Sequence, residues 1–165
     1  MDVLVARQAI FDRQRKLYGY ELLFRSDAAT NAFDGTEATA ATMQVLSNTL
    51  LSIGAEQLLG DKKAFINFDH RLLQSNLHLT LPPGSLVIEI LETVVPTTDL
   101  LSLCQSIQKQ GYSLALDDFT DEPDFAPLAS IANLIKVDMR LSSREQQEHL
   151  LRAHKPRGVM MLAEK

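Results

Sequence analysis

Polar side chains stand at or near the end of almost every apolar segment of this chain, where a buried strand has no need of them. They are Glu21, Asn67, Glu89, Asp117, Asp118, Lys136, Asp138 and Glu164. Any one of them could cap a loop, which is a common structural role of such residues. An unpaired carboxylate in apolar surroundings is costly, so their recurrence in six segments favours a common site.

The chemistry of that site follows from the residue types. Carboxylate and amide oxygens suit hard cations such as Mg²⁺, Mn²⁺ or Ca²⁺. A lysine beside them suits a phosphate group or the activation of a water molecule. The pattern therefore predicts metal-assisted cleavage of a phosphate ester.

The segment 111–119 carries two of the acids in adjacent positions. A turn glycine is followed by apolar residues and then by Asp117 and Asp118, which predicts a buried parallel strand with acid at its C-terminal end. Because side chains alternate along a strand, we expect Asp117 to share a face with Ala115 and Asp118 to point with Leu116. Sites of α/β sheets and barrels gather at this end of the strands.

Strands alternating with helices would place these residues. We expect a hairpin of residues 3–11 and 17–25, and then a helix from Glu37 to Ile53 that Thr36 caps and Gly54 ends. The strands expected after it are 64–68, 86–91, 113–119, 134–137 and 158–163. The helices expected between them are 70–75, 97–107, 125–132 and 143–154. This alternation predicts an α/β fold with a parallel sheet. A complete (β/α)₈ barrel needs ~250 residues, so this chain has room for about seven strands.

Composition excludes several other classes of protein. The chain has 165 residues, 45 % of them hydrophobic, which fits one globular domain spanning 1–165. The net charge is −5 with no basic cluster, so we expect no nucleic-acid partner. No apolar run is long enough to span a membrane, and the first residues lack a basic-then-apolar pattern, so we expect neither a membrane span nor a signal segment. The single cysteine, Cys104, predicts a buried core thiol and a reducing, cytoplasmic compartment. The four histidines lack zinc-ligand spacing and are expected at the surface or at helix ends.

The motifs, taken in order, resemble the EAL-domain family. They are Gln8-Ala9-Ile10, Glu21-Leu22-Leu23-Phe24-Arg25, Asn67, Glu89-Ile90-Leu91-Glu92, Asp117-Asp118-Phe119, Lys136-Val137-Asp138 and Ala163-Glu164. Members are bacterial phosphodiesterases of cyclic di-GMP, built on a modified (β/α)₈ TIM barrel with an antiparallel first strand. The resemblance implies that this chain is the N-terminal two-thirds of such a barrel, ending in strand seven. The final Ala163-Glu164-Lys165 is similar to a degenerate branch in which an EAL-like domain precedes an HDOD domain.

The resemblance implies a role for each matching residue. The implied metal ligands, for Mg²⁺ or Mn²⁺, are Glu21, Asn67, Glu89, Asp117 and Asp118, the last shared with a second metal. Lys136 would contact the attacking water, and Glu164 is the first glutamate of the strand-seven motif. Gln8 would line the substrate groove, and Arg25 would grip a substrate phosphate. Glu92 would steady the loop after Asp118.

Departures from the family pattern predict weak metal binding and little hydrolysis. The signature reads Glu-Leu-Leu, and Ala9 replaces a proline. The loop after Phe119 reads Thr120-Asp121-Glu122-Pro123-Asp124 where active members have flexible glycines. Two further catalytic positions of the family follow Lys165 in the pattern and lie outside this chain. We therefore expect one weakly held metal at best and no useful hydrolysis.

Three functions stay open from the sequence. The first is a non-catalytic signalling or interaction module, the second a cyclic di-GMP receptor that does not cleave its ligand, and the third a working phosphodiesterase. An open barrel leaves two strand edges unpaired, so we also expect self-association through those edges. Other signalling proteins or a downstream HDOD domain are the remaining partners that we expect.

Overall fold

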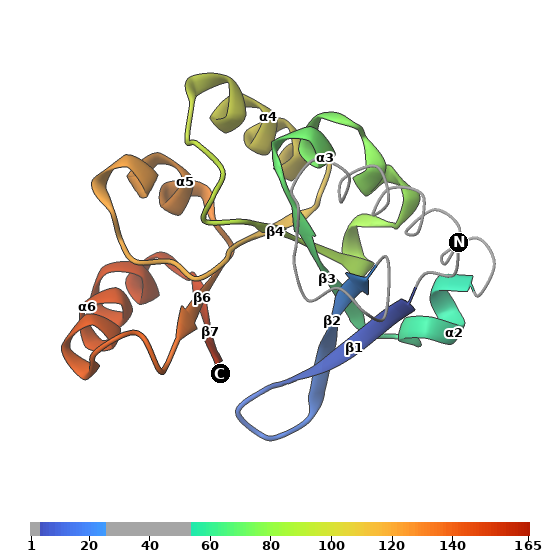
Figure 1. The fold of residues 1–165 in the computed structure, drawn as a ribbon, viewed down its shortest axis with the longest axis horizontal. Helices are drawn as coiled ribbons and strands as arrows, with labels where there is room; N and C mark the ends of the chain where they lie inside the picture. Colours follow the sequence, from blue (N-terminus) through green and yellow to red (C-terminus); the bar gives the residue numbers. More distant parts are fainter. Residues whose placement is uncertain (1–3, 26–53) are drawn as a thin grey trace.

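The strands form one curved sheet in the order of the chain. The computed structural model describes residues 4–25 and 54–165. Its seven strands are β1 (Leu4–Phe11), β2 (Leu17–Arg25), β3 (Lys63–Phe68), β4 (Leu86–Ile90), β5 (Ser113–Leu116), β6 (Leu134–Asp138) and β7 (Met160–Glu164). The first pair is antiparallel and every later pair is parallel. The sheet is an incomplete barrel, as expected (Figure 1).

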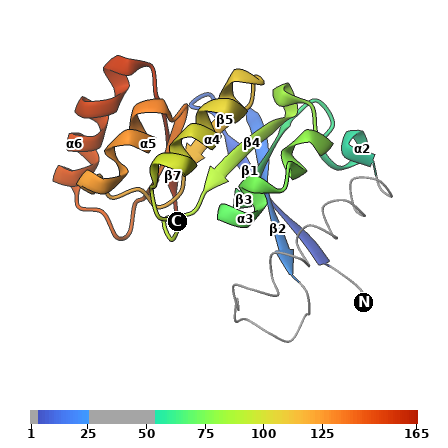
Figure 2. The same ribbon diagram turned by 90° about the horizontal axis from the view of Figure 1, so that it is seen from above.

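Helices follow the strands and cover the outer side of the sheet (Figures 1 and 2). They are α2 (Ala55–Leu59), α3 (His70–Gln74), α4 (Thr98–Lys109), α5 (Ala126–Ile131) and α6 (Arg144–His154), with short 3₁₀ turns η2 (Leu77–Thr80), η3 (Pro83–Ser85), η4 (Pro123–Phe125) and η5 (Lys155–Arg157). Two helices begin with side-chain caps: the Thr97 hydroxyl accepts from Leu100 N, and Ser143 forms a capping box with Gln146. None of the described helices is long and apolar enough to cross a membrane.

The two faces of the sheet bury different sets of side chains. The outer face and the helices form the large core, which includes Leu100, the buried Cys104 and Ile107 of α4. The inner face forms a smaller apolar layer of Ile10, Phe65, Val87, Ala115 and Leu134. This layer closes the floor of the barrel interior. Whatever chemistry the inner face performs must take place above it, toward the carboxyl ends of the strands.

The close packing of β2 on β3 depends on Gly19, so we expect Gly19→Ala to destabilise the fold. An added Cβ would lie 2.7 Å from the Lys63 carbonyl oxygen and 2.9 Å from the Phe65 ring. The carbonyl belongs to the sheet and cannot move cheaply, so the expected loss is about 1–3 kcal/mol. Gly84→Ala is the matched control, because nothing lies within 4 Å of its Cβ position. Urea unfolding curves that coincide for the two variants would contradict this packing.

Some expectations differ from the structure or lie outside it. The strand predicted at 113–119 ends at Leu116, because the chain turns at Asp117 and Asp118. The helix predicted from Glu37 to Ile53, with its cap at Thr36, lies outside the described residues; Gly54, its predicted end, has a φ of 82° just before α2. The outer edges of β1 and β7 pair with no other described strand. Self-association through these edges stays a prediction.

Candidate functional site

The polar residues of the strands form a layer directly above the apolar floor. Phe65, Val87 and Leu134 face inward, and the residue two positions later on each strand faces the same way. On β2 to β7 these later positions are Glu21, Asn67, Glu89, Asp117, Lys136 and Glu164. The strands are parallel and nearly in register, with Asn67 opposite Glu89, so these side chains meet at one mouth of the barrel. The structure thus brings together the polar groups that the sequence pattern selected.

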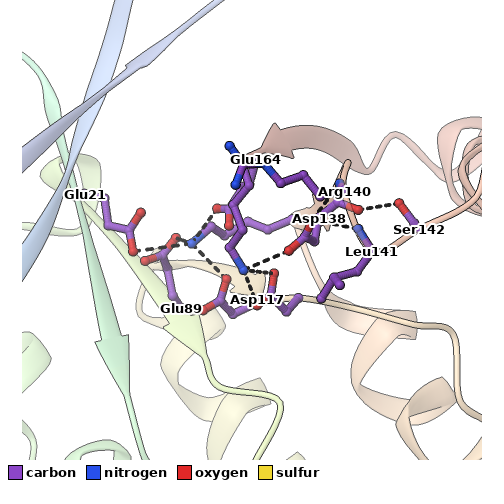
Figure 3. A network of polar contacts seen from close by, with 11 residues as sticks. Glu21, Glu89, Asp117, Asp138, Arg140, Leu141, Ser142 and Glu164 are labelled. Carbon is purple, nitrogen blue, oxygen red and sulfur yellow. Dashed lines mark hydrogen bonds and ion pairs between the residues drawn. The ribbon is translucent and has the colours of Figure 1, made fainter. Parts of the chain in front are cut away.

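Lys136 is the centre of this layer. Its ammonium nitrogen lies 2.8 Å from Glu89 Oε1, 2.9 Å from Asp117 Oδ1, 2.7 Å from Glu164 Oε1 and 3.6 Å from Glu21 Oε1 (Figure 3). The contacts to Glu89 and Asp117 have ion-pair distances without the alignment of hydrogen bonds. We therefore treat them as charge–charge contacts. The side chains of Lys136 and Glu89 are 1 % and 0 % exposed, so little water screens them.

One ammonium does not neutralise four carboxylates, and burial together with these charges shifts the pKa values of Glu89 and Lys136. Burial raises the pKa of Glu89 to about 8; the positive charge of Lys136 opposes the rise, and the negative charges of Glu21 and Asp117 add to it. Burial by itself lowers the pKa of Lys136, but the charges of Glu89 and Asp117 outweigh it, so the net pKa is raised. Lys136 is therefore charged, and the site favours either a proton on Glu89 or an added cation.

The donor set fits a divalent cation. Oxygens of Glu21, Glu89 and Glu164 lie within 4.8 Å of one another. Within the described part of the chain, two buried oxygens beside them, Asn67 Oδ1 and Glu89 Oε2, have no hydrogen-bond partner. Buried polar atoms of native proteins are nearly always paired, so these two are free to serve as ligands. Carboxylate and amide oxygens are the donors that hard cations prefer.

The Asp118 side chain lies at the same mouth of the barrel, although strand alternation predicts that it points to the other face of the sheet. Its φ of 42° turns the chain directly after β5, so the expectation that Asp118 points with Leu116 is wrong. Oxygens of Asp117, Asp118 and Glu164 lie within 4.8 Å of one another. This second set of acids shares Glu164 with the first set.

Lys165 and Asp138 complete this side of the site; the sequence pattern selected Asp138 as one of the polar residues but did not select Lys165. Lys165 Nζ donates to Asp118 Oδ2 at 2.8 Å and Oδ1 at 3.2 Å, and it lies 3.0 Å from Asp138 Oδ2. Asp138 Oδ1 accepts from the backbone N–H groups of Arg140 and Leu141 at 2.7 and 3.0 Å (Figure 3). The hydrogen bonds to Asp118 and Asp138 raise the pKa of Lys165. Alternation along β6 puts Asp138 on the same face of the strand as Lys136.

The loop after Asp118 is fastened to α6. Asp121, with a φ of 60°, places its carboxylate 2.9 Å from His149 Nε2 and 3.4 Å from His154 Nε2. Phe119 packs edge-on against the His154 ring at 5.7 Å between centroids. His154 and His78 are buried, so the prediction that all four histidines lie at the surface or at helix ends is wrong for His78, which sits in the core against Tyr112.

Of the remaining predicted site residues, Gln8 and Glu92 are not brought to the carboxylates. Gln8 pairs with Glu21 across the hairpin, and its side chain is exposed. Arg25 ends β2, but its side chain lies outside the described residues. Glu92 is exposed, and no hydrogen bond or ion pair joins it to the loop 119–125 in the described part of the chain. Histidines of α6 hold that loop instead. A cavity of about 360 Å³ lies beside the site, between this loop and α6, with Asp118, Thr120, Asp138 and Gln146 in its lining.

Comparison with curated proteins gives two relatives. The uncharacterized protein YuxH of Bacillus subtilis is 39 % identical over 170 residues, covering 100 % of this chain and 41 % of the relative. The cyclic di-GMP phosphodiesterase CdgJ of Vibrio cholerae is 37 % identical over 155 residues, covering 93 % of this chain and 36 % of the relative. The chain thus spans about two-fifths of the length of these relatives. No family model matches the sequence.

Solved structures of EAL proteins share the fold. The Bacillus subtilis YkuI protein, with an EAL domain and in complex with cyclic di-GMP and calcium, matches with a TM-score of 0.73 at 21 % identity over 98 % of this chain and 48 % of its own. Klebsiella pneumoniae BlrP1 with calcium and cyclic di-GMP matches with a TM-score of 0.71 at 22 % identity, with the same coverage. An EAL domain protein of Listeria monocytogenes gives 0.70 at 21 % identity, covering 98 % of this chain and 76 % of its own. The chain therefore has the fold of EAL domains, and the resemblance to the EAL family that its motifs carry is confirmed.

Proposed function

We propose that this chain is an EAL-type domain of cyclic di-GMP signalling that recognises the dinucleotide through a divalent cation and does not hydrolyse it at a useful rate. In this proposal residues 1–165 act as one domain. The fold, and a relative named as a cyclic di-GMP phosphodiesterase, support the choice of ligand. The cytoplasm remains the compartment that we expect.

The observation that carries the proposal is the convergence of Glu21, Glu89, Asp117 and Glu164 on Lys136 at one barrel mouth. These carboxylates repel a phosphodiester, so an anionic ligand can approach them only with a cation in between. Glu21, Asn67, Glu89 and Asp117 would hold that cation, as the sequence predicts. When bound there, a divalent cation polarises a phosphoryl oxygen and offsets its charge. Mg²⁺ and Mn²⁺ both suit these oxygens.

The second acid set and the loop beside it support a non-catalytic role. Lys165 already donates hydrogen bonds to both oxygens of Asp118, and Asp121 holds the loop after Asp118 against α6 through His149 and His154. A group that is held in other contacts cannot orient a reacting atom without first breaking them. Slow or absent cleavage is the expected consequence.

We expect Mg²⁺ to stabilise the chain and Glu89→Gln to remove most of that effect. Cation at about 100 times its Kd adds about 2.7 kcal/mol to the free energy of unfolding. The substitution conserves shape and removes the charge that would bind the ion. Glu92→Gln is the matched control, because Glu92 is exposed and lies outside the cluster. Thermal unfolding with and without Mg²⁺ measures the effect, and equal stabilisation of the two variants would exclude this cation site.

Ligand binding is the direct test of the proposed function. Isothermal titration calorimetry with cyclic di-GMP is expected to show binding with Mg²⁺ present and none after chelation, for the reason of charge given above. Glu89→Gln should abolish binding and Glu92→Gln should preserve it. Binding that is equally tight without the cation would contradict recognition through a metal.

A working phosphodiesterase is the second candidate function. The observation in its favour is that Glu21, Asn67, Glu89, Asp117 and Lys136 are all present and face one another.

The degenerate branch, the HDOD partner and self-association stay predictions. Light scattering at high concentration tests self-association, since edge pairing predicts a dimer.

A further inference from the structure

The acids at the barrel mouth form two neighbouring sets that share one residue. Glu21, Glu89 and Glu164 make up the first set, and Asp117, Asp118 and Glu164 make up the second. Two cations bridged by a shared carboxylate lie ~3.5–4 Å apart in two-metal sites. The arrangement of the acids alone would therefore suit two divalent cations rather than one.

Each set already faces one ammonium, but the two ammonium groups leave different oxygens without a partner. In the first set, Lys136 Nζ lies 2.8 Å from Glu89 Oε1 and 2.7 Å from Glu164 Oε1, and the buried Glu89 Oε2 still has no partner in the described residues. In the second set, Lys165 donates to both oxygens of Asp118 and reaches Asp138 as well. Asp138 is 7 % exposed and is fixed by the backbone of Arg140 and Leu141, so Lys165 has a rigid second anchor.

We propose that the Lys165 ammonium takes the place of a second divalent cation beside Asp118, so that this chain holds one cation where its acids would otherwise hold two. This inference rests on the proposed cation site, which shares Glu21 and Glu89 with the first set. A metal ion bound to Asp118 would lie within a few ångströms of the Lys165 nitrogen, and the two like charges would repel. A lysine on the same chain competes at an effective concentration of about millimolar or higher, so a free cation displaces it only when it binds more tightly.

Removal of the Lys165 ammonium is expected to allow a second divalent cation to bind beside Asp118. Lys165→Met keeps most of the length of the side chain and removes its charge; Lys165→Arg keeps the charge. Equilibrium dialysis with Mn²⁺ should give one ion per chain for the wild type and for Lys165→Arg. It should give two for Lys165→Met, with affinity for the second ion at least tenfold higher than in the wild type. Spin coupling in the electron paramagnetic resonance spectrum of Lys165→Met would report that the two ions are neighbours.

Asp118→Asn in the Lys165→Met background identifies the place of the second ion, and this double variant should return to one. Lys165 is nearly half exposed, so its variants should fold, and circular dichroism checks this. Lys165→Gln serves as a second neutral variant. The same Mn²⁺ stoichiometry in the wild type and in both neutral variants would overturn the inference while leaving the proposed function intact. No Mn²⁺ on any variant would overturn both.

Discussion

Replacing Lys136 by methionine is expected to lower the free energy of unfolding of the cation-free chain by about 3–5 kcal/mol at pH 8. The substitution conserves most of the side-chain volume but removes the only ammonium within 3 Å of Glu89, Asp117 and Glu164 among the described residues. The buried carboxylates would then face one another without an opposing charge. Urea unfolding followed by circular dichroism measures the loss.

Lys62→Met is the matched control for Lys136→Met. Lys62 also makes an ion pair, at 3.0 Å to Asp61, but Asp61 is 85 % exposed, so water screens the pair and its loss should matter little. Added Mg²⁺ should restore more stability to Lys136→Met than to the wild type, because the ion replaces the lost charge. Equal losses in the two lysine variants would show that Lys136 does not hold the cluster together.

The same cluster predicts how stability changes with pH. Burial raises the pKa of Glu89 to about 8 from an ordinary value of 4.5. A carboxyl whose pKa is raised by folding contributes its full stability below pH 4.5 and loses it as pH rises through 8. The deficit of Lys136→Met should therefore be greater at pH 8 than at pH 6.

Cyclic di-GMP incubated with this chain and Mn²⁺ is expected to stay intact. Asp118 is engaged by Lys165, and the loop after it is fastened by Asp121 to His149 and His154. Loss of one oriented group in a catalytic site costs on the order of 10²–10³ in rate, and groups that act as one assembly fail together. Chromatography for the linear dinucleotide measures the rate, with CdgJ as the positive control.

Turnover by the wild type would support the phosphodiesterase instead, provided that it depends on this site. Glu21→Gln is the informative variant, because Glu21 lies at the edge of the cluster, 3.6 Å from Lys136, and the change conserves its shape. Activity that vanishes in Glu21→Gln while the fold is retained would overturn the non-catalytic proposal. Activity that persists would point to a contaminating enzyme.

The order of the elements and the residues of the polar layer follow from local sequence pattern. Alternation places Asn67 two residues after Phe65 and Glu89 two residues after Val87, so each acid or amide faces the side that the apolar floor faces. Because neighbouring strands are parallel, the carboxyl ends that carry these residues lie at the same edge of the sheet. That is why the strands and the cluster around Lys136 could be predicted from local pattern alone.

The contacts that surround that layer depend on how distant parts of the chain pack together. The φ of 42° at Asp118 ends the alternation and turns the side chain into the mouth, and no period of two or 3.6 residues encodes such a turn. The contacts of Lys165 with Asp118, and of Asp121 with His149 and His154, join residues 47, 28 and 33 positions apart. Local pattern carries no information on such pairs, because their distance depends on how the strands curl and where α6 docks. The proposed choice between one cation and two rests on one of these long-range contacts, that of Lys165 with Asp118.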